Sequence, residues 1–120
     1  MNYFGLRKNN LCVEKITALS LTKKYETPFY CYSLGQLKNN FYKFDNTFKN
    51  TKPLICFSVK SNSNINFLKE LKKIGSGADV VSGGELLKAT KAGIDAKKIV
   101  FSGIGKTYEE IELAIKKKIL

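Results

Sequence analysis

The chain has 120 residues, and 43% of them are hydrophobic, so it can form one ordinary core and is not disordered by composition. Its formal net charge is +11, but the positive side chains are scattered lysines with a single arginine, which favours a solvated surface over a nucleic-acid partner. No apolar run reaches the roughly 20 residues that span a membrane, and the start lacks a signal-peptide stretch, so we expect a cytoplasmic protein without a membrane partner.

Three cysteines, Cys12, Cys31 and Cys56, lie far apart, and the chain has no histidine. An odd number of separated cysteines argues against a disulfide framework, and the missing histidine argues against a zinc site. Because Cys31 and Cys56 stand in apolar runs, we expect both to be small buried side chains.

The front of the chain predicts little regular structure. The first 12 residues show no strong pattern. Apolar side chains then recur within residues 13–24 and predict a short helix, which Thr27-Pro28 ends because a residue before proline prefers extended backbone. The aromatic run Phe29–Tyr32 predicts a short strand.

A longer helix is predicted from about Leu34 to Phe48, with Ser33 as its N-cap. Its apolar residues recur every three or four positions and form one face. They are Leu34, Leu37, Phe41, Phe44 and Phe48.

Strands and helices alternate from residue 54 onward. The apolar runs Leu54–Val59, Ala78–Val81 and Ile99–Phe101 predict buried strands. Helices are predicted at 67–74, with Gly75 as C-cap, at 85–92, ended by Gly93, and after Thr107. This order predicts an α/β fold with right-handed βαβ units and a parallel sheet, either a small open sheet or part of a (β/α)8 barrel.

The last of these helices has the clearest start. Thr107 is followed three residues later by Glu110, the spacing of a capping box. Ile111, Ala114 and Ile115 are expected to supply its buried side.

The most informative short segment is Cys56–Asn62, in which Lys60 ends the first buried strand. In a parallel barrel the carboxyl ends of the strands line the active site. A lysine there is expected to be partly desolvated, which lowers its pKa and favours the neutral amine that attacks an aldehyde. Position alone, however, fits an ordinary strand-exit lysine at least as well.

A second segment, Gly75–Leu86, contains two acidic residues. Asp79 stands at the edge of the next buried strand and could stabilise a protonated imine formed by Lys60 or steer its proton, or could instead bond to backbone amides. Ser82-Gly-Gly-Glu85 predicts a glycine turn into a helix, which is weak as a phosphate site, and Glu85 could simply favour the helix N-terminus.

These segments resemble a known family. Ser58–Asn62 (SVKSN) is similar to the alanine-valine-lysine-alanine-asparagine motif of fold-type III pyridoxal-phosphate decarboxylases, and Gly75–Leu86 (GSGADVVSGGEL) resembles the signature of diaminopimelate decarboxylases. Thr27–Ser33 resembles the strand before the barrel in that family, Ile99–Thr107 its third barrel strand and loop, and Tyr3–Gly5 its start.

The resemblance implies a cofactor, a reaction and a domain plan. Residues 1–33 would belong to a β-domain, and residues 34–120 would form the first part of a (β/α)8 barrel that binds pyridoxal 5′-phosphate. Lys60 would bond covalently to the cofactor, and Asp79 and Glu85 would lie near it. The substrate would be meso-diaminopimelate, the products L-lysine and carbon dioxide, and the full-length form a homodimer.

The departures from the family concern length. The later barrel strands, the glycine-rich phosphate loop and a C-terminal β-domain have no counterpart in these 120 residues, and we expect an incomplete barrel of about three units that is inactive alone. The alternatives are a decarboxylase of ornithine, arginine or carboxynorspermidine, a non-catalytic pyridoxal-phosphate protein, or a small basic protein that binds nucleic acid.

Overall fold

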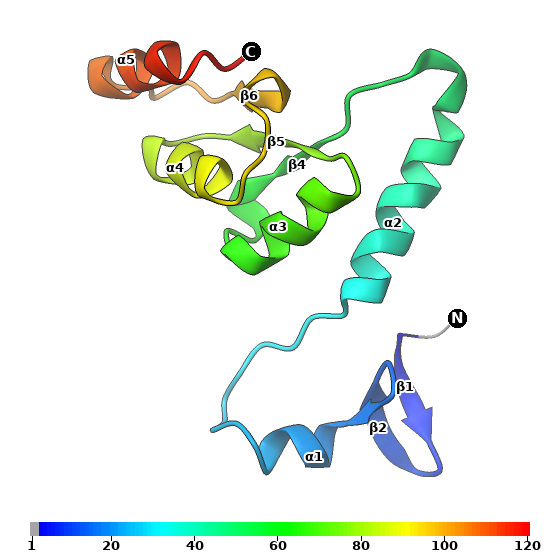
Figure 1. Cartoon of the computed structure of the whole chain (residues 1–120). Coiled ribbons are helices and arrows are strands. Elements are labelled where there is room, and N and C mark those ends of the chain that lie inside the picture. Colours follow the sequence, from blue (N-terminus) through cyan, green and yellow to red (C-terminus); the bar gives the residue numbers. More distant parts are fainter. Residues whose placement is uncertain (1–2) are drawn as a thin grey trace. The chain divides into compact units, whose positions relative to one another are not determined.

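The computed structural model describes residues 3–120, and the chain divides into two compact units, residues 1–44 and 45–120 (Figure 1). The domain boundary after residue 33 that the resemblance implies stays a prediction. Within residues 3–120, no helix has both the length and the apolar character needed to cross a bilayer.

A three-stranded antiparallel sheet opens the first unit. Strands β1 (Phe4–Arg7) and β2 (Asn10–Val13) form a hairpin, and β3 (Ile16–Thr17) pairs with the other edge of β2. Lys8 and Asn9 at the hairpin turn have φ values of 48° and 61°. Two successive left-handed residues give the turn a twist that matches the strands. The sequence contained no turn signal for this hairpin, because its turn lacks the usual glycine.

The helix predicted over residues 13–24 is wrong in its first half. Helix α1 is only Ala18–Thr22, and the Thr17 side chain caps it by accepting a hydrogen bond from Ser20 N–H. Glu14, with φ of 54°, turns the chain between β2 and β3 and so prevents a helix there. The strand predicted over Phe29–Tyr32 is also wrong, because this segment has no ladder partner within residues 3–120.

Helix α2 (Leu34–Thr47) confirms the long helix predicted after Ser33. The Ser33 hydroxyl accepts from Gln36 N–H at 2.9 Å, as predicted for the N-cap. The predicted apolar face is nevertheless not a buried one, since Leu34, Phe44 and Phe48 are 41%, 53% and 43% exposed.

The second unit is built on a parallel sheet in the order β4-β5-β6 (Figure 1). Its strands are β4 (Cys56–Ser58), β5 (Gly77–Val80) and β6 (Ile99–Phe101), close to the three predicted runs. One-turn 3-10 helices η1, η2 and η3 lie before β4, after β4 and before β6. They span Lys49–Thr51, Val59–Ser61 and Ala96–Lys98.

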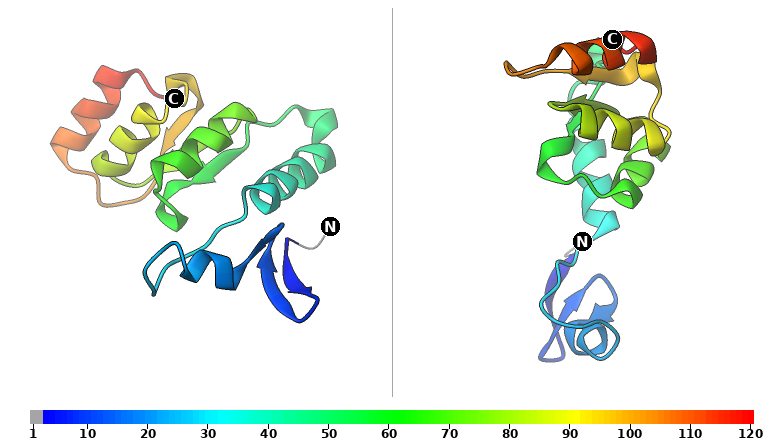
Figure 2. Two further views of the ribbon diagram at one scale, coloured as in Figure 1. Left: turned by 60° about the horizontal axis from the view of Figure 1, so that its bottom comes forward. Right: turned by 90° about the vertical axis from the view of Figure 1, so that its left-hand side faces the viewer.

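Three helices alternate with these strands and lie in a row beside the sheet (Figure 2). They are α3 (Ile65–Lys73), α4 (Gly83–Lys91) and α5 (Tyr108–Lys117). The unit's core lies between sheet and helices and includes side chains with at most 1% exposure. These are Val59, Leu68, Leu71, Ala78, Val80, Leu86, Ala89 and Ile99. The α/β fold and the alternating order are thus confirmed.

Two burial predictions are wrong. Ile111 and Ile115 on α5 are 45% and 72% exposed, because the elements of residues 3–120 cover only part of that helix. Among the cysteines, Cys12 is the buried one, whereas Cys31 and Cys56 are half-buried, although all three are free thiols. Local hydrophobicity marks the faces suited to burial, but the surrounding elements decide which of them are covered.

Candidate functional site

Two polar residues of the second unit, Ser58 and Asp79, lie near the carboxyl edge of its parallel sheet. Ser58, Asp79 and Val100 are register partners across the three strands, so their side chains share one face of the sheet. Phe57, one residue from Ser58, points to the other face and packs on Phe67 of α3 with ring centroids 5.6 Å apart. The helices therefore cover one face, and the face with Ser58 and Asp79 is the one available for chemistry.

Lys60 lies in η2, two residues after the last residue of β4 and at this same edge. The position predicted from the sequence is therefore the observed one. Its side chain is exposed, however, so the predicted partial desolvation is wrong for the described residues. A strand end fixes where the Lys60 Cα lies, but desolvation of a long flexible side chain needs surrounding atoms that local sequence does not specify.

Two buried polar atoms flank Lys60 without a hydrogen-bond partner. They are Ser58 Oγ, at the end of β4, and Asn62 Nδ2, directly after η2. Buried polar groups are normally paired, and an unpaired one costs free energy. Each of these two atoms can donate a hydrogen bond to an acceptor oxygen, which is the character that a phosphorylated ligand requires of the residues that hold it. Both residues belong to the SVKSN motif, but neither was predicted as a site residue.

Asp79 is half-buried in β5, and its Oδ1 accepts a hydrogen bond from Ser102 Oγ at 2.5 Å. Ser102 directly follows β6, so this bond joins neighbouring strands. The carboxylate also acts on Cys56, whose thiol pKa is raised first by burial and then by the negative charge of Asp79. Ser102 was not predicted as a site residue, although a hydroxyl directly after a buried strand was the available signal.

Glu85 lies in the first turn of α4, and its carboxylate already has a backbone partner. Glu85 Oε2 accepts from Val81 N–H at 2.9 Å, while Glu85 N–H donates to Ser82 Oγ at 3.2 Å. These two bonds form a reciprocal cap, which accounts for an acidic residue here without a ligand. A role of Glu85 near the cofactor stays a prediction.

The N-terminus of α4, interpreted above as a weak phosphate site, is engaged by the protein itself. Gly83 N–H donates to Glu110 Oε1 at 2.6 Å, so a carboxylate of the chain occupies the position that a phosphate would take. Further along α4, Lys88 Nζ donates to Ser63 Oγ at 2.8 Å. This second bond ties the loop that follows Lys60 to the helix.

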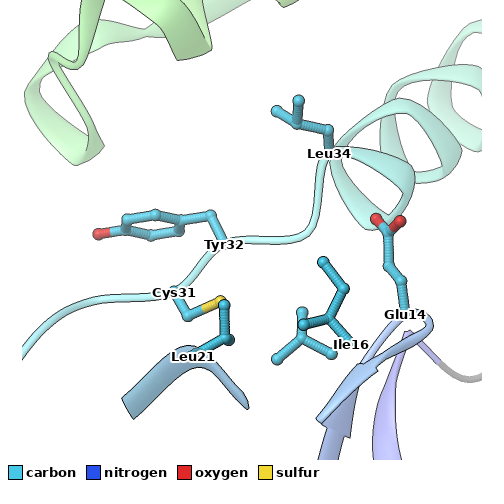
Figure 3. Close-up of a pocket in the computed structure, with 7 residues that line it drawn as sticks. Glu14, Ile16, Leu21, Cys31, Tyr32 and Leu34 are labelled. Carbon is cyan, nitrogen blue, oxygen red and sulfur yellow. The ribbon is translucent and has the colours of Figure 1, made fainter. Parts of the chain in front are cut away.

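A pocket of about 220 Å³ lies within the first unit (Figure 3). It is lined by Val13, Glu14, Ile16, Leu21, Cys31, Tyr32 and Leu34. The Glu14 carboxylate points toward the start of α2, where it accepts from Ser33 Oγ at 2.6 Å and Gly35 N–H at 2.9 Å. This carboxylate therefore has a capping role. Residues 3–120 contain no cluster of three or more metal-ligating side chains.

The second unit is an α/β domain of the class that binds its ligand beyond the carboxyl ends of parallel strands. The model of one family, described as "Pyridoxal-dependent decarboxylase, pyridoxal binding domain", matches residues 34–120. The chain belongs to this family of pyridoxal-dependent decarboxylases, and membership implies pyridoxal phosphate as the cofactor.

Curated relatives and solved structures agree with this assignment. The chain is 44% identical over 119 residues to the diaminopimelate decarboxylase of Haemophilus influenzae, covering 99% of the chain and 29% of that protein. It is 50% identical over 100 residues to that of Helicobacter pylori, covering 83% and 25%. A diaminopimelate decarboxylase structure from M. jannaschii, in co-complex with L-lysine, matches with a TM-score of 0.93, 34% identity and coverage of 98% and 29%.

The chain thus spans less than a third of the length of these relatives. The part that it spans contains the predicted cofactor lysine, Lys60, and the three-stranded parallel sheet.

Proposed function

We propose that this chain is the front part of a diaminopimelate decarboxylase. In that reaction, meso-2,6-diaminopimelate loses one carboxylate as carbon dioxide, and a proton takes its place on the same carbon to give L-lysine. The single observation that carries the proposal is Lys60 at the carboxyl end of β4, within a chain 44% identical to a diaminopimelate decarboxylase over 119 residues.

In this proposal Lys60 is the residue that binds the cofactor, and its amine is accessible at the sheet edge. Asp79 supplies a fixed negative charge on the next strand, oriented by the hydroxyl of Ser102. Ser58 and Asn62 offer unpaired polar atoms on either side of the lysine. Pyridoxal phosphate, when bound, supplies the electron sink for the bond that breaks, while these residues hold and orient it. Glu85 would lie near the cofactor, with one carboxylate oxygen already bonded to Val81 N–H.

The finer fold that we propose is the beginning of a (β/α)8 barrel. Backbone hydrogen bonds support it: Gly77 N–H donates to Ile55 O at 2.9 Å where β5 begins beside β4. The same kind of bond recurs between Leu120 N–H and Ile99 O at 3.1 Å, beside the start of β6. Leu120 thus has the hydrogen bond expected for a further parallel strand.

The test of the function is covalent capture of the cofactor. The purified protein is incubated with pyridoxal phosphate, reduced with borohydride and mapped by mass spectrometry. We expect the label on Lys60 and its loss in Lys60→Ala. Lys69→Ala, an exposed lysine on α3, is the matched control and should keep the label. A label that persists in Lys60→Ala would overturn the assignment of this lysine.

We further propose that residues 1–120 do not decarboxylate diaminopimelate by themselves. Apolar side chains such as Ile104, Ile115 and Leu120 are 108%, 72% and 72% exposed, which supports the need for further structure around them. Carbon dioxide release by the purified 120-residue chain would contradict this.

The three free thiols support the proposed cytoplasmic location. A homodimer is proposed for the full-length form, from the resemblance, and is tested by the mass of that full-length protein in solution.

A further inference from the structure

The loop between β6 and α5, residues 102–107, is bonded at its start to the end of β5 and is linked at its end, through Glu110, to the first residue of α4. At its start, Ser102 N–H donates to Val80 O at 2.9 Å, and Ser102 Oγ donates to Asp79. At its end, the carboxylate of Glu110 accepts from Thr107 N–H at 3.1 Å and from Gly83 N–H at 2.6 Å. Together with the short turn from Val80 to Gly83, these bonds close a ring that includes the carboxyl end of β5.

The middle of this loop lies beside Val81, the residue that follows β5. A Cβ added at Gly103, whose φ is +91°, would lie 3.7 Å from the Cβ of Val81. Lys106 Nζ bonds to Gly103 O and lies 5.3 Å from the centroid of the Phe101 ring. The loop is thus compact, and its middle lies next to the residue that follows β5.

Glu110 is the residue in this ring that joins the two helices. Its Oε2 completes the capping box of α5 with Thr107, and its Oε1 reaches across to the first residue of α4. Gly83 is buried, and an added Cβ there would lie 3.2 Å from Glu110 Cγ, so the two residues are in close contact. The hydrogen bond from Gly83, followed by that from Thr107, lowers the pKa of the Glu110 carboxyl.

We propose that Glu110 is a positioning residue of the Lys60 site, whose carboxylate fastens the start of α5 to the start of α4 and thereby holds the carboxyl end of β5, with Asp79, in place. The role at the site rests on the function proposed above. The fastening itself does not, because it follows from contacts within residues 79–110.

The first experiment measures how firmly Glu110 holds Gly83 N–H at the start of α4. Amide hydrogen exchange at Gly83 is compared among the parent protein, Glu110→Ala, Glu110→Gln and Glu112→Gln. Glu112 is the matched control, because it lies on the same helix and pairs with Lys116, at 2.9 Å, one turn further along that helix. We expect Gly83 exchange to rise at least about tenfold in Glu110→Ala, less in Glu110→Gln, which keeps one carbonyl acceptor, and not in Glu112→Gln. Equal exchange in all variants overturns the proposal.

The second experiment asks whether the fastening positions Asp79. Because burial and the Asp79 carboxylate together raise the pKa of the Cys56 thiol, the pH profile of Cys56 alkylation, mapped by mass spectrometry, reports on that carboxylate. We expect Glu110→Ala to move the profile to lower pH, Glu110→Gln to move it less, and Glu112→Gln to leave it unchanged. A profile that stays in place in Glu110→Ala, despite faster Gly83 exchange, would reduce Glu110 to an ordinary helix cap and overturn the positioning role.

The third experiment separates this inference from the proposed function. The rate of borohydride-trapped labelling at Lys60 by pyridoxal phosphate should fall about threefold to tenfold in Glu110→Gln and remain unchanged in Glu112→Gln. Failure of the parent protein to label at Lys60 refutes the proposed function alone, since Gly83 exchange and Cys56 alkylation still measure the action of Glu110 on β5. Normal labelling in Glu110→Gln and Glu110→Ala refutes the inference alone.

Discussion

The two units differ in how their structure is stabilised. Among the buried apolar side chains of the described residues, only Cys12 belongs to residues 1–44, and all the others belong to residues 45–120. The second unit buries leucine, isoleucine, valine and alanine between its sheet and helices. The first unit relies on a hairpin, on Thr17 as a helix cap and on the Glu14 carboxylate at the start of α2.

This difference teaches where precise geometry can be expected. A close-packed core resists small changes in volume, so positions attached to it are held firmly. The strand end with Lys60 and Asp79 is attached to such a core through Val59 and Val80, both fully buried. Polar caps on the surface contribute less and depend on pH and solvent.

The largest effect is expected from a core truncation in the second unit. Leu86→Ala removes a fully buried side chain of α4 and should lower the free energy of unfolding by about 2–5 kcal/mol. Leu6→Ala in β1, at a side chain 74% exposed, is the counterpart in the first unit and should change it by less than about 0.5 kcal/mol. Chemical denaturation measures both, and equal losses would remove the distinction between the units.

The second prediction concerns close packing below the site. A Cβ at Gly77 would lie 2.3 Å from Lys98 O and 2.8 Å from Cys56 Sγ, so Gly77→Ala should cost about 1–3 kcal/mol. Gly105→Ala is the control, because no heavy atom lies within 4 Å of its added Cβ. Thermal unfolding compares the two variants. Unchanged stability in Gly77→Ala would mean that β5 can move away from β6.

The third prediction compares helix caps between the units. Thr107→Ala removes the capping box of the ten-residue helix α5 and should cost about 1 kcal/mol. Thr17→Ala removes the cap of the five-residue helix α1 and should cost less, about 0.5 kcal/mol. Urea denaturation followed by circular dichroism gives both values. A larger loss for Thr17→Ala would show that α1 contributes more to the first unit than its size indicates.

The smallest effect depends on pH and lies in the first unit. The hydroxyl of Ser33 and then Gly35 N–H lower the pKa of the Glu14 carboxyl below its ordinary value of 4.5. Because the folded-state pKa is the lower one, this stabilisation is present above pH 4.5 and is lost as the pH falls through the folded value. The Gly35 amide resonance should titrate in acid, and Glu14→Gln should abolish that titration. An unaltered titration in the variant would assign it to another group.

Much of the second unit was predictable from the amino-acid sequence, because its signals are local and agree with one another. Short apolar runs marked β4, β5 and β6, and Thr107 with Glu110 marked the start of α5. The position of Lys60 after β4 followed from the same pattern. The first unit was predicted less well, because its hairpin turns through Lys8 and Asn9 without a glycine signal.

What the sequence determined by itself was the order of strands and helices, the strand end at which Lys60 stands, and the family. The tertiary structure alone decided that Ser102 donates to Asp79, that Glu110 reaches Gly83, and that Lys60 is exposed within these residues. The physical reason is one of range. Periodicity and caps depend on neighbours three or four positions away, whereas these contacts join residues 23 and 27 positions apart and form only when the strands pair.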